Sequence, residues 1–156
     1  MNLKIKEFAP PLAQQFADLN LAWLEKFFKV EPHDKDVLYN CEEEIIAKGG
    51  KIFFAELDEE IVGTFALLKL DEQTLELTKM AVDEKLRGKK IGQFMLKYFQ
   101  QYVKEHLEFE YVLYSSRRLE NAIYLYRKFG FQEVELEKNA PYERADIKMI
   151  YQPNHL

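Results

Sequence analysis

The run ELTKMAVDEKLRGKKIGQFMLKY, residues 76–98, decides the fold. Its first seven residues, 76–82, are typical of a β-strand, and the run that begins at Ile91 is typical of an α-helix. Apolar residues recur there at intervals of three and four, which places them on one helix face. The sequence therefore predicts a strand, a short loop and a long helix with one buried side. The buried face comprises Ile91, Phe94, Met95, Tyr98, Phe99, Tyr102 and Val103.

The loop between strand and helix is basic and rich in glycine. Gly88 and Gly92 bracket Lys89 and Lys90. The first N–H groups of a helix have no partner inside it, and the positive end of the helix dipole lies there. Such a loop suits a phosphate or pyrophosphate, because glycine lets the main chain come close to the anion. The alternative is a solvated basic turn without a ligand.

Length and composition point to one globular domain, residues 1–156. A chain of this size buries roughly two thirds of its unfolded surface, and 47% hydrophobic with 31% charged residues is ordinary for a soluble protein. No apolar run approaches the ~20 residues of a membrane-spanning helix, and residues 1–8 lack a signal-peptide core. We therefore expect a cytoplasmic protein without a membrane partner. The net charge of −5 argues against nucleic acid as the main partner.

Cysteine and histidine usage speaks against a metal site. Cys41 is the single cysteine, which excludes an internal disulfide and a multi-cysteine metal site. His33, His106 and His155 lack metal-ligand spacing. We expect no metal and a structural role for Cys41.

The remaining chain predicts an α+β order. An antiparallel hairpin is expected around the turn at 58–60, Asp34 or Asp36 is expected to cap the second helix, and Gly130 to end the last one. The predicted strands are 3–8, 51–57, 61–70, 74–82, 109–114, 131–136 and 145–151, and the predicted helices are about 10–29, 34–47, 91–103 and 120–129.

Two local motifs carry a family resemblance. The first is RGKKIG at 87–92, after a strand that ends at Val82, and the second is Ala122-x-x-x-Tyr126 followed by Gly130-Phe131. With the element order, they resemble the GNAT superfamily of N-acetyltransferases over essentially the whole chain. Within it, ELTKMAV and residues 142–147 look like the acetyltransferase domains that some bacteria fuse to MarR-type regulators.

The resemblance implies a fold and an activity. The implied fold is a single-domain, mixed and mostly antiparallel sheet of about six to seven strands, flanked by about four helices. The implied activity is transfer of an acetyl group from acetyl-CoA to a primary amine, on a small molecule or a peptide, by direct attack in a ternary complex. The alternative is a non-catalytic acyl-CoA sensor or interaction module. The acceptor is open, and so is the oligomeric state, a homodimer included.

The resemblance also implies cofactor-binding residues. The loop would hold the pyrophosphate, and the end of the strand would pair with the pantetheine arm unless an ordinary strand ladder continues there. Lys90 replaces the usual loop glycine, so its backbone must keep an ordinary φ or accept strain. Leu119 replaces a common asparagine, which leaves Ser116 as the substitute contact. The implied set is Met80, Ala81, Val82, Arg87, Gly88, Lys89, Lys90, Ile91, Gly92, Gln93 and Ser116.

Five residues are candidates for chemistry and acceptor binding. Glu76 shares a strand face with Thr78 and Met80 and matches the place of a family base; the alternative is a surface glutamate paired with Lys79 or a helix cation. Tyr126 would protonate or hydrogen-bond the leaving thiolate, unless it is a core tyrosine. Trp23, Glu143 and Arg144 would shape the acceptor site, with Arg144 meeting an acidic group on the substrate. The alternatives are core packing for Trp23 and a surface ion pair for Arg144.

Overall fold

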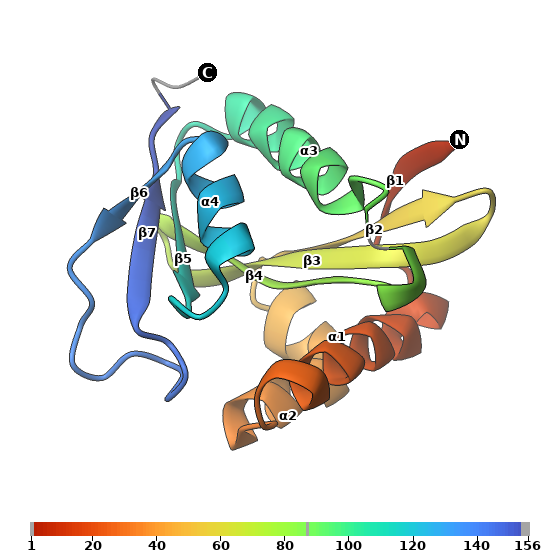
Figure 1. Ribbon diagram of the computed structural model, residues 1–156, viewed down its shortest axis with the longest axis horizontal. Helices are drawn as coiled ribbons and strands as arrows, with labels where there is room; N and C mark the ends of the chain where they lie inside the picture. Colours follow the sequence, from red (N-terminus) through yellow and green to blue (C-terminus); the bar gives the residue numbers. More distant parts are fainter. Residues whose placement is uncertain (1, 87, 154–156) are drawn as a thin grey trace.

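The computed structural model describes residues 2–86 and 88–153, which form one seven-stranded sheet in the order β1-β2-β3-β4-β5-β7-β6 (Figure 1). Neighbouring strands are antiparallel except β4 and β5, which are parallel. The expected mixed, mostly antiparallel α+β fold is therefore confirmed. The strands are β1 Leu3–Glu7, β2 Lys51–Leu57, β3 Glu60–Asp71, β4 Thr74–Val82, β5 Glu110–Ser115, β6 Phe131–Val134 and β7 Ile147–Tyr151.

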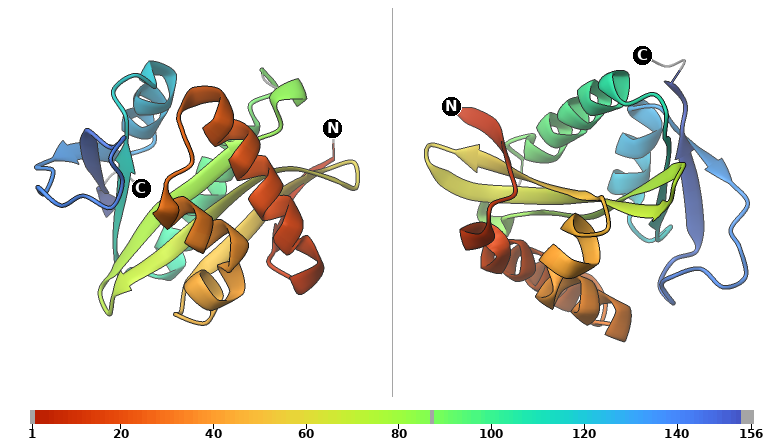
Figure 2. Two further views of the ribbon diagram at one scale, coloured as in Figure 1. Left: turned by 90° about the horizontal axis from the view of Figure 1, so that it is seen from below. Right: turned by 180° about the vertical axis from the view of Figure 1, so that it is seen from behind.

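Helices cover both faces of the sheet. In Figure 1, α1 and α2 lie below it and α3 and α4 above it, and the views of Figure 2 agree. No helix in the described residues is long and apolar enough to cross a membrane. The α-helices are α1 Ala13–Phe27, α2 Pro32–Tyr39, α3 Ile91–Glu105 and α4 Glu120–Lys128, with short helical turns at Pro10–Leu12, Glu42–Ile46 and Glu84–Leu86.

Strand alternation separates two hydrophobic cores. On β2, Phe53 and Ala55 pack toward α3 and α4, whereas Ile52 and Phe54 pack toward α1 and α2. Phe99 lies at the centre of the first core, with its ring 5.5 Å from that of Phe131. Most of the predicted apolar face of the long helix packs in this core, but Phe94 is only half-buried and outside it, and Leu96, which was not predicted, is buried in it. This face fixes the direction in which α3 presents its N-terminus.

The second helix differs from its prediction. Its N-cap is Glu31, with Pro32 in the first turn, so neither Asp34 nor Asp36 is the cap. Asp34 instead completes a capping box by accepting the Glu31 backbone N–H at 2.9 Å. The helix also stops at Tyr39, and the segment predicted to continue it forms a separate π-helical turn at Glu42–Ile46.

The last two strands are shorter than predicted. β6 ends at Val134 and β7 begins at Ile147, so residues 135–146 form a long connection. This connection is attached to the start of α2: the backbone N–H of Glu143 donates to Glu31 Oε1 at 2.9 Å. Tertiary attachment to α2 therefore replaces strand pairing in this segment.

Gly50 tests the packing between β3 and the turn at Glu42–Ile46. A Cβ atom at Gly50 would lie 2.4 Å from the Leu67 carbonyl oxygen and 2.9 Å from Ile45 Cγ2. We expect Gly50→Ala to lower the free energy of unfolding by about 1–3 kcal/mol, because backbone must move. The control is Gly92→Ala, whose Cβ meets no atom within 4 Å. Urea denaturation measures both, and equal stability of Gly50→Ala and the parent chain would contradict this packing.

Candidate active site

The site begins where β4 and β5 part. Their parallel pairing covers Thr74–Glu110, Leu75–Tyr111 and Glu76–Val112 and goes no further, although β4 runs on to Val82 and β5 to Ser115. The sequence left open whether an ordinary ladder continues here. The structure shows parted strands, so the β5-facing edge of β4 beyond Glu76 is not paired with β5.

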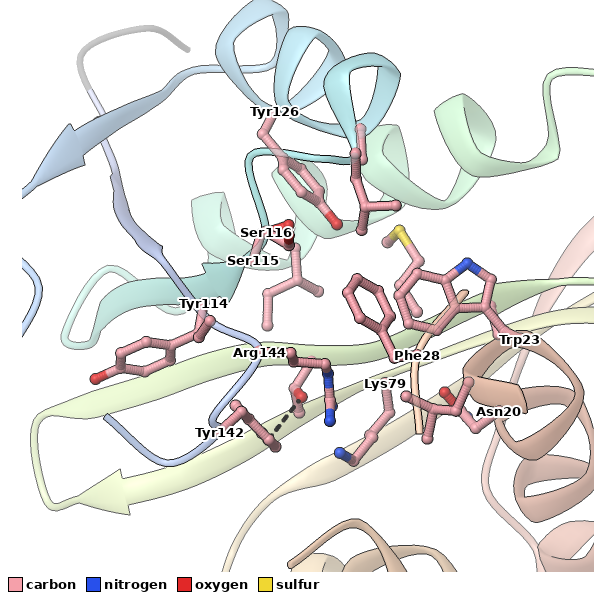
Figure 3. A pocket seen from close by; sticks show the side chains of 18 of the residues that line it. Asn20, Trp23, Phe28, Lys79, Tyr114, Ser115, Ser116, Tyr126, Tyr142 and Arg144 are labelled. Atoms are coloured by element: carbon pink, nitrogen blue, oxygen red, sulfur yellow. Dashed lines mark hydrogen bonds between the residues drawn. The ribbon is translucent and has the colours of Figure 1, made fainter. Parts of the chain in front are cut away.

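A pocket of about 240 Å³ occupies the space between the parted strands. Figure 3 shows its two sides: Tyr126 and Ser116 lie on one, and Trp23, Lys79 and Arg144 on the other. We name them the α4 half and the α1 half, after the helices that border them. The α4 half is lined by Met80, Ala81, Val82, Gly92, Ser115, Ser116, Leu119, Ala122 and Tyr126, and the α1 half by Asn20, Trp23, Leu24, Phe28, Lys79, Tyr142 and Arg144.

The basic loop leads into the α4 half. Gly88 has φ +83, and a Cβ atom at Gly88 or Gly92 would meet no atom within 4 Å. Lys89 and Lys90 are exposed, and Lys90 adopts the left-handed conformation with φ 60 immediately before α3. The loop therefore keeps the left-handed backbone at the position where lysine replaces glycine, which costs conformational strain. Arg87 lies outside the described residues.

A β-bulge reshapes β4 beside the pocket. Thr78 faces Ala66 and Ala81 faces Thr64, so two residues, Lys79 and Met80, lie opposite one. Lys79 takes the left-handed conformation, with φ 54.

Beyond the bulge, the side chains of β4 point to the opposite face of the sheet from the one that simple alternation predicts. Met80 packs with the core below α3, to which Leu77 also belongs. The prediction that Met80 shares a face with Glu76 is therefore wrong, because simple alternation stops at the bulge.

Buried ion pairs hold the bulge against α2. Lys79 Nζ lies 2.7 Å from Asp34 Oδ1, and the two side chains are 3% and 0% exposed. Arg144 donates to both oxygens of Asp34, at 2.8 and 2.9 Å, and to Glu31 at 3.0 Å. Burial alone would raise the pKa of Asp34, but the Arg144 hydrogen bonds and the Lys79 charge hold it well below its ordinary value.

Tyr142 lies beneath the two cations. Lys79 Nζ and the Arg144 guanidinium carbon are each 4.6 Å from the centre of its ring. Its hydroxyl is 3.3 Å from Glu76 Oε2 and 3.3 Å from Thr78 Oγ1. Tyr142 thus connects the charged groups to the candidate base.

Glu76 is buried behind Tyr142 and does not line the pocket. It is 1% exposed, and its Oε1 has no hydrogen-bond partner. Burial raises the pKa of Glu76 from 4.5 to about 7, against the opposing effect of the Lys79 charge. The alternative of an exposed glutamate paired with Lys79 is wrong, since Lys79 pairs with Asp34.

Tyr126 and Ser116 both line the α4 half. The Tyr126 ring packs edge-on against Phe131, with centroids 5.9 Å apart, and burial raises the pKa of Tyr126 to about 12. Ser116 is 3% exposed, and its Oγ accepts the Arg118 backbone N–H at 3.3 Å. Tyr126 therefore keeps its proton at neutral pH.

The other predicted residues divide between pocket and surroundings. Trp23 and Arg144 line the α1 half, but the Arg144 donors described above are held by Asp34 and Glu31. Glu143 is exposed and contributes its backbone N–H to Glu31. Ile91 is buried in the core, and Gln93 lies in the first turn of α3.

Sequence reasoning missed the pocket roles of Asn20, Phe28 and Lys79. Asn20 is 2% exposed on a helix that is otherwise buried through apolar residues, and a buried polar residue on an apolar face was the signal available for it. Lys79 interrupts the apolar alternation of a central strand, which was the signal for the bulge. Phe28 follows the last residue of α1 and gave no such signal.

Comparison with known proteins assigns the family. The model of the "Acetyltransferase (GNAT) family" matches residues 16–131, more than half of the chain. The chain belongs to the GNAT family of acetyltransferases. Membership of this family implies an acyltransferase. A search of curated proteins finds no match.

Solved GNAT structures share the fold. A GNAT acetyltransferase from Staphylococcus aureus Mu50 has a TM-score of 0.84 and 24% identity, over 97% of this chain and 99% of that chain. A GNAT acetyltransferase from Elizabethkingia anophelis, with acetyl-CoA bound, has a TM-score of 0.66 and 23% identity over 96% and 95%. The PaiA N-acetyltransferase from Thermoplasma acidophilum, in complex with coenzyme A, has a TM-score of 0.74 and 17% identity, over 97% of this chain and 99% of that chain.

Glu76→Gln tests the buried carboxyl of this GNAT protein. With a folded pKa of about 7 against 4.5, the folded state binds more protons than the unfolded chain between these values. Glu76 therefore contributes stability below about pH 4.5 that is lost as the pH rises through 7. We expect the stability of Glu76→Gln, relative to the parent chain, to increase from pH 4.5 to pH 8 in urea denaturation. A difference that does not change with pH would contradict the burial of an ionisable Glu76.

Proposed function

We propose that the chain is an acetyl-CoA-dependent N-acetyltransferase in which a primary amine attacks the thioester directly in a ternary complex. The observation that carries this proposal is the continuity of the α4 half. It runs from the open turn of Gly92, along the unpaired edge of β4, to the Tyr126 side chain. A candidate phosphate site, an extended channel and a hydrogen-bond donor thus follow one another in the order that an acyl-CoA requires.

The residues of the α4 half, and those of the basic loop that leads into it, fit coenzyme A. Space around Gly88 and Gly92, two exposed lysines and the first amides of α3 suit a pyrophosphate. Met80, Ala81 and Val82 line the channel beside an edge where β4 is not paired with β5, so their backbone groups are available for a pantetheine arm. When bound, acetyl-CoA supplies the activated acetyl group.

Tyr126 would stabilise the leaving group. Its pKa of about 12 lies well above that of an ordinary thiol, near 8.5. Complete proton transfer from the phenol to a thiolate is therefore uphill, whereas a hydrogen bond to the developing negative charge is favourable. The role that we propose for Tyr126 is hydrogen-bond donation to sulfur.

Glu76 would act through Tyr142 and Thr78. The carboxyl does not line the pocket, but it lies 3.3 Å from the hydroxyl of Tyr142, and Tyr142 is itself a pocket residue. A pKa of about 7 leaves a substantial fraction of Glu76 ionised at neutral pH, as a proton acceptor requires. Glu76 is in this proposal the terminal acceptor of a proton that leaves the amine through the Tyr142 hydroxyl.

The burial of Glu76 also supports a second candidate function. A carboxyl sealed behind Tyr142 is compatible with a non-catalytic acyl-CoA sensor of the same fold. Turnover of any amine with release of coenzyme A excludes that reading. A single domain over residues 1–156, a cytoplasmic location, homodimer formation and the likeness to MarR-fused domains stay predictions.

Gly88→Asp tests the anion site. We expect coenzyme A at about 100 times its dissociation constant to stabilise the parent chain by about 2.7 kcal/mol, and to lose this effect on Gly88→Asp because the carboxylate repels the pyrophosphate. The matched control is Gly88→Asn, which has the same shape, lacks the charge and tolerates positive φ. Thermal denaturation with and without coenzyme A measures both. Equal ligand stabilisation of the Asp and Asn variants would contradict the loop assignment.

Tyr126→Phe tests the leaving-group contact. We expect kcat to fall about 10-fold or more while acetyl-CoA affinity changes little, because the lost hydrogen bond forms with negative charge that develops during reaction. Thiol release measured with both acetyl-CoA and the amine at saturation gives kcat, and the thermal shift with acetyl-CoA gives its affinity. Tyr124→Phe is the control, since Tyr124 lies on the same helix and is 66% exposed. Unchanged kcat in Tyr126→Phe would exclude the role.

A further inference from the structure

The α1 half is the part of the pocket that acetyl-CoA would leave free, so under the proposed function it receives the acceptor. Its walls are aromatic. The Trp23 ring packs against Phe28, with centroids 5.7 Å apart, and Phe28 also lies 4.9 Å from the Arg118 guanidinium carbon. Tyr142 closes the opposite side. Flat apolar surfaces that are already packed in place suit a rigid apolar body.

The charge lining this half is positive only. Within the described residues, the charged side chains that line the pocket are Lys79 and Arg144, and no aspartate or glutamate lines it. The carboxylates of Asp34 and Glu31 lie outside the lining and are engaged by those same two cations. An ammonium group that enters the pocket therefore meets two cations that are already paired and no carboxylate in the lining, since Glu76 lies behind Tyr142, so little offsets the cost of its desolvation.

A carboxylate on the acceptor would gain little. Both cations are paired: Lys79 lies 2.7 Å from Asp34, and Arg144 makes hydrogen bonds of 2.8–3.0 Å to Asp34 and Glu31. An anionic group would have to compete with these buried carboxylates. Charge complementarity in this half thus favours neither a polycation nor an acid.

We propose that the acceptor is an aromatic primary monoamine whose amino group is its only charge. This inference rests on the proposed function and narrows its acceptor class. The aromatic walls hold the ring, and burial in a lining without a carboxylate disfavours the ammonium ion and so promotes the neutral amine that attacks the thioester. Proton transfer from the amine and formation of the C–N bond accompany departure of the thiolate.

One neighbouring feature is the strongest argument for a different acceptor. A groove between α1 and the segment after β4 shares Trp23 and Val82 with the pocket and contains Asp18, Asp83 and Glu84. Glu84 is paired with Lys26 there, and Asp83 caps the turn through the Lys85 backbone N–H. A long polyamine could reach the groove past Trp23, so spermidine is the decisive competitor in the test.

The experiment compares kcat/KM for phenethylamine, L-phenylalanine and spermidine at saturating acetyl-CoA. We expect phenethylamine to exceed spermidine by at least about 10-fold, and also to exceed L-phenylalanine, which adds only a carboxylate. Spermidine equal to or above phenethylamine would overturn the inference and leave the proposed function intact, and so would a preference for L-phenylalanine. Acetyl-CoA binding without turnover of any amine would overturn both.

Trp23 provides matched variants. We expect Trp23→Gln to lower kcat/KM for phenethylamine by about 10-fold through loss of the aromatic wall. Trp23→Glu has nearly the same shape and adds the missing carboxylate, so its spermidine-to-phenethylamine ratio should exceed that of Trp23→Gln. Equal ratios in the two variants would contradict the charge argument. Thermal denaturation of each variant verifies folding, and the comparison of amines on the parent chain decides the inference without the variants.

Discussion

The constraint on which the structure depends is the short parallel pairing of β4 with β5. Three residue pairs join the two halves of the sheet, and beyond Glu76 and Val112 the strands separate. Backbone groups that lose their neighbour in a sheet must find another partner, either solvent or a ligand. The pocket, its two halves and the edge of Met80–Val82 that is not paired with β5 all follow from this separation. Because the short segment 83–90 joins β4 to α3, the same separation brings the basic turn to one end of the pocket.

The buried ion pairs explain how the separated region keeps its shape. Lys79 adopts φ 54, which is unfavourable for a lysine, and the surrounding contacts must compensate for it. Its Nζ is fixed by Asp34 of α2, and Asp34 is fixed in turn by Arg144 of the 135–146 connection. Buried ion pairs add little net stability because desolvation is costly. Their contribution here is positional, since they join three segments that are distant in sequence around one side of the pocket.

Much of this arrangement follows from local sequence. The apolar period of α3, the turn before it and the glycine after α4 are local signals, and the elements that they predict are present in the structure. The errors arise where tertiary contacts override local preference. Aspartate commonly caps helices, but Asp34 serves here as the common partner of Lys79 and Arg144. The bulge at Lys79 reverses the side on which Met80 packs, and its only local signal is a lysine at a position where the strand alternation predicts an apolar residue. The α1 half combines residues from α1, β4 and the late connection, so no single stretch of sequence describes it.

Under the proposed function, the position of Glu76 would link the charge of the acceptor to the chemistry. A base that contacts the amine directly could accept an ammonium ion as a salt bridge and then deprotonate it. Glu76 is instead separated from the pocket by Tyr142, whose own pKa burial raises well above 10.0. Tyr142 therefore donates to Glu76 and does not ionise on its own, so a proton crosses it only as another leaves toward Glu76. Under the proposed function, such a relay works best for an amine that loses its proton easily, and a pocket lining without a carboxylate favours the neutral form of a bound amine. In that proposal, the lining that offers a polycation no counter-charge would also ease deprotonation of a monoamine.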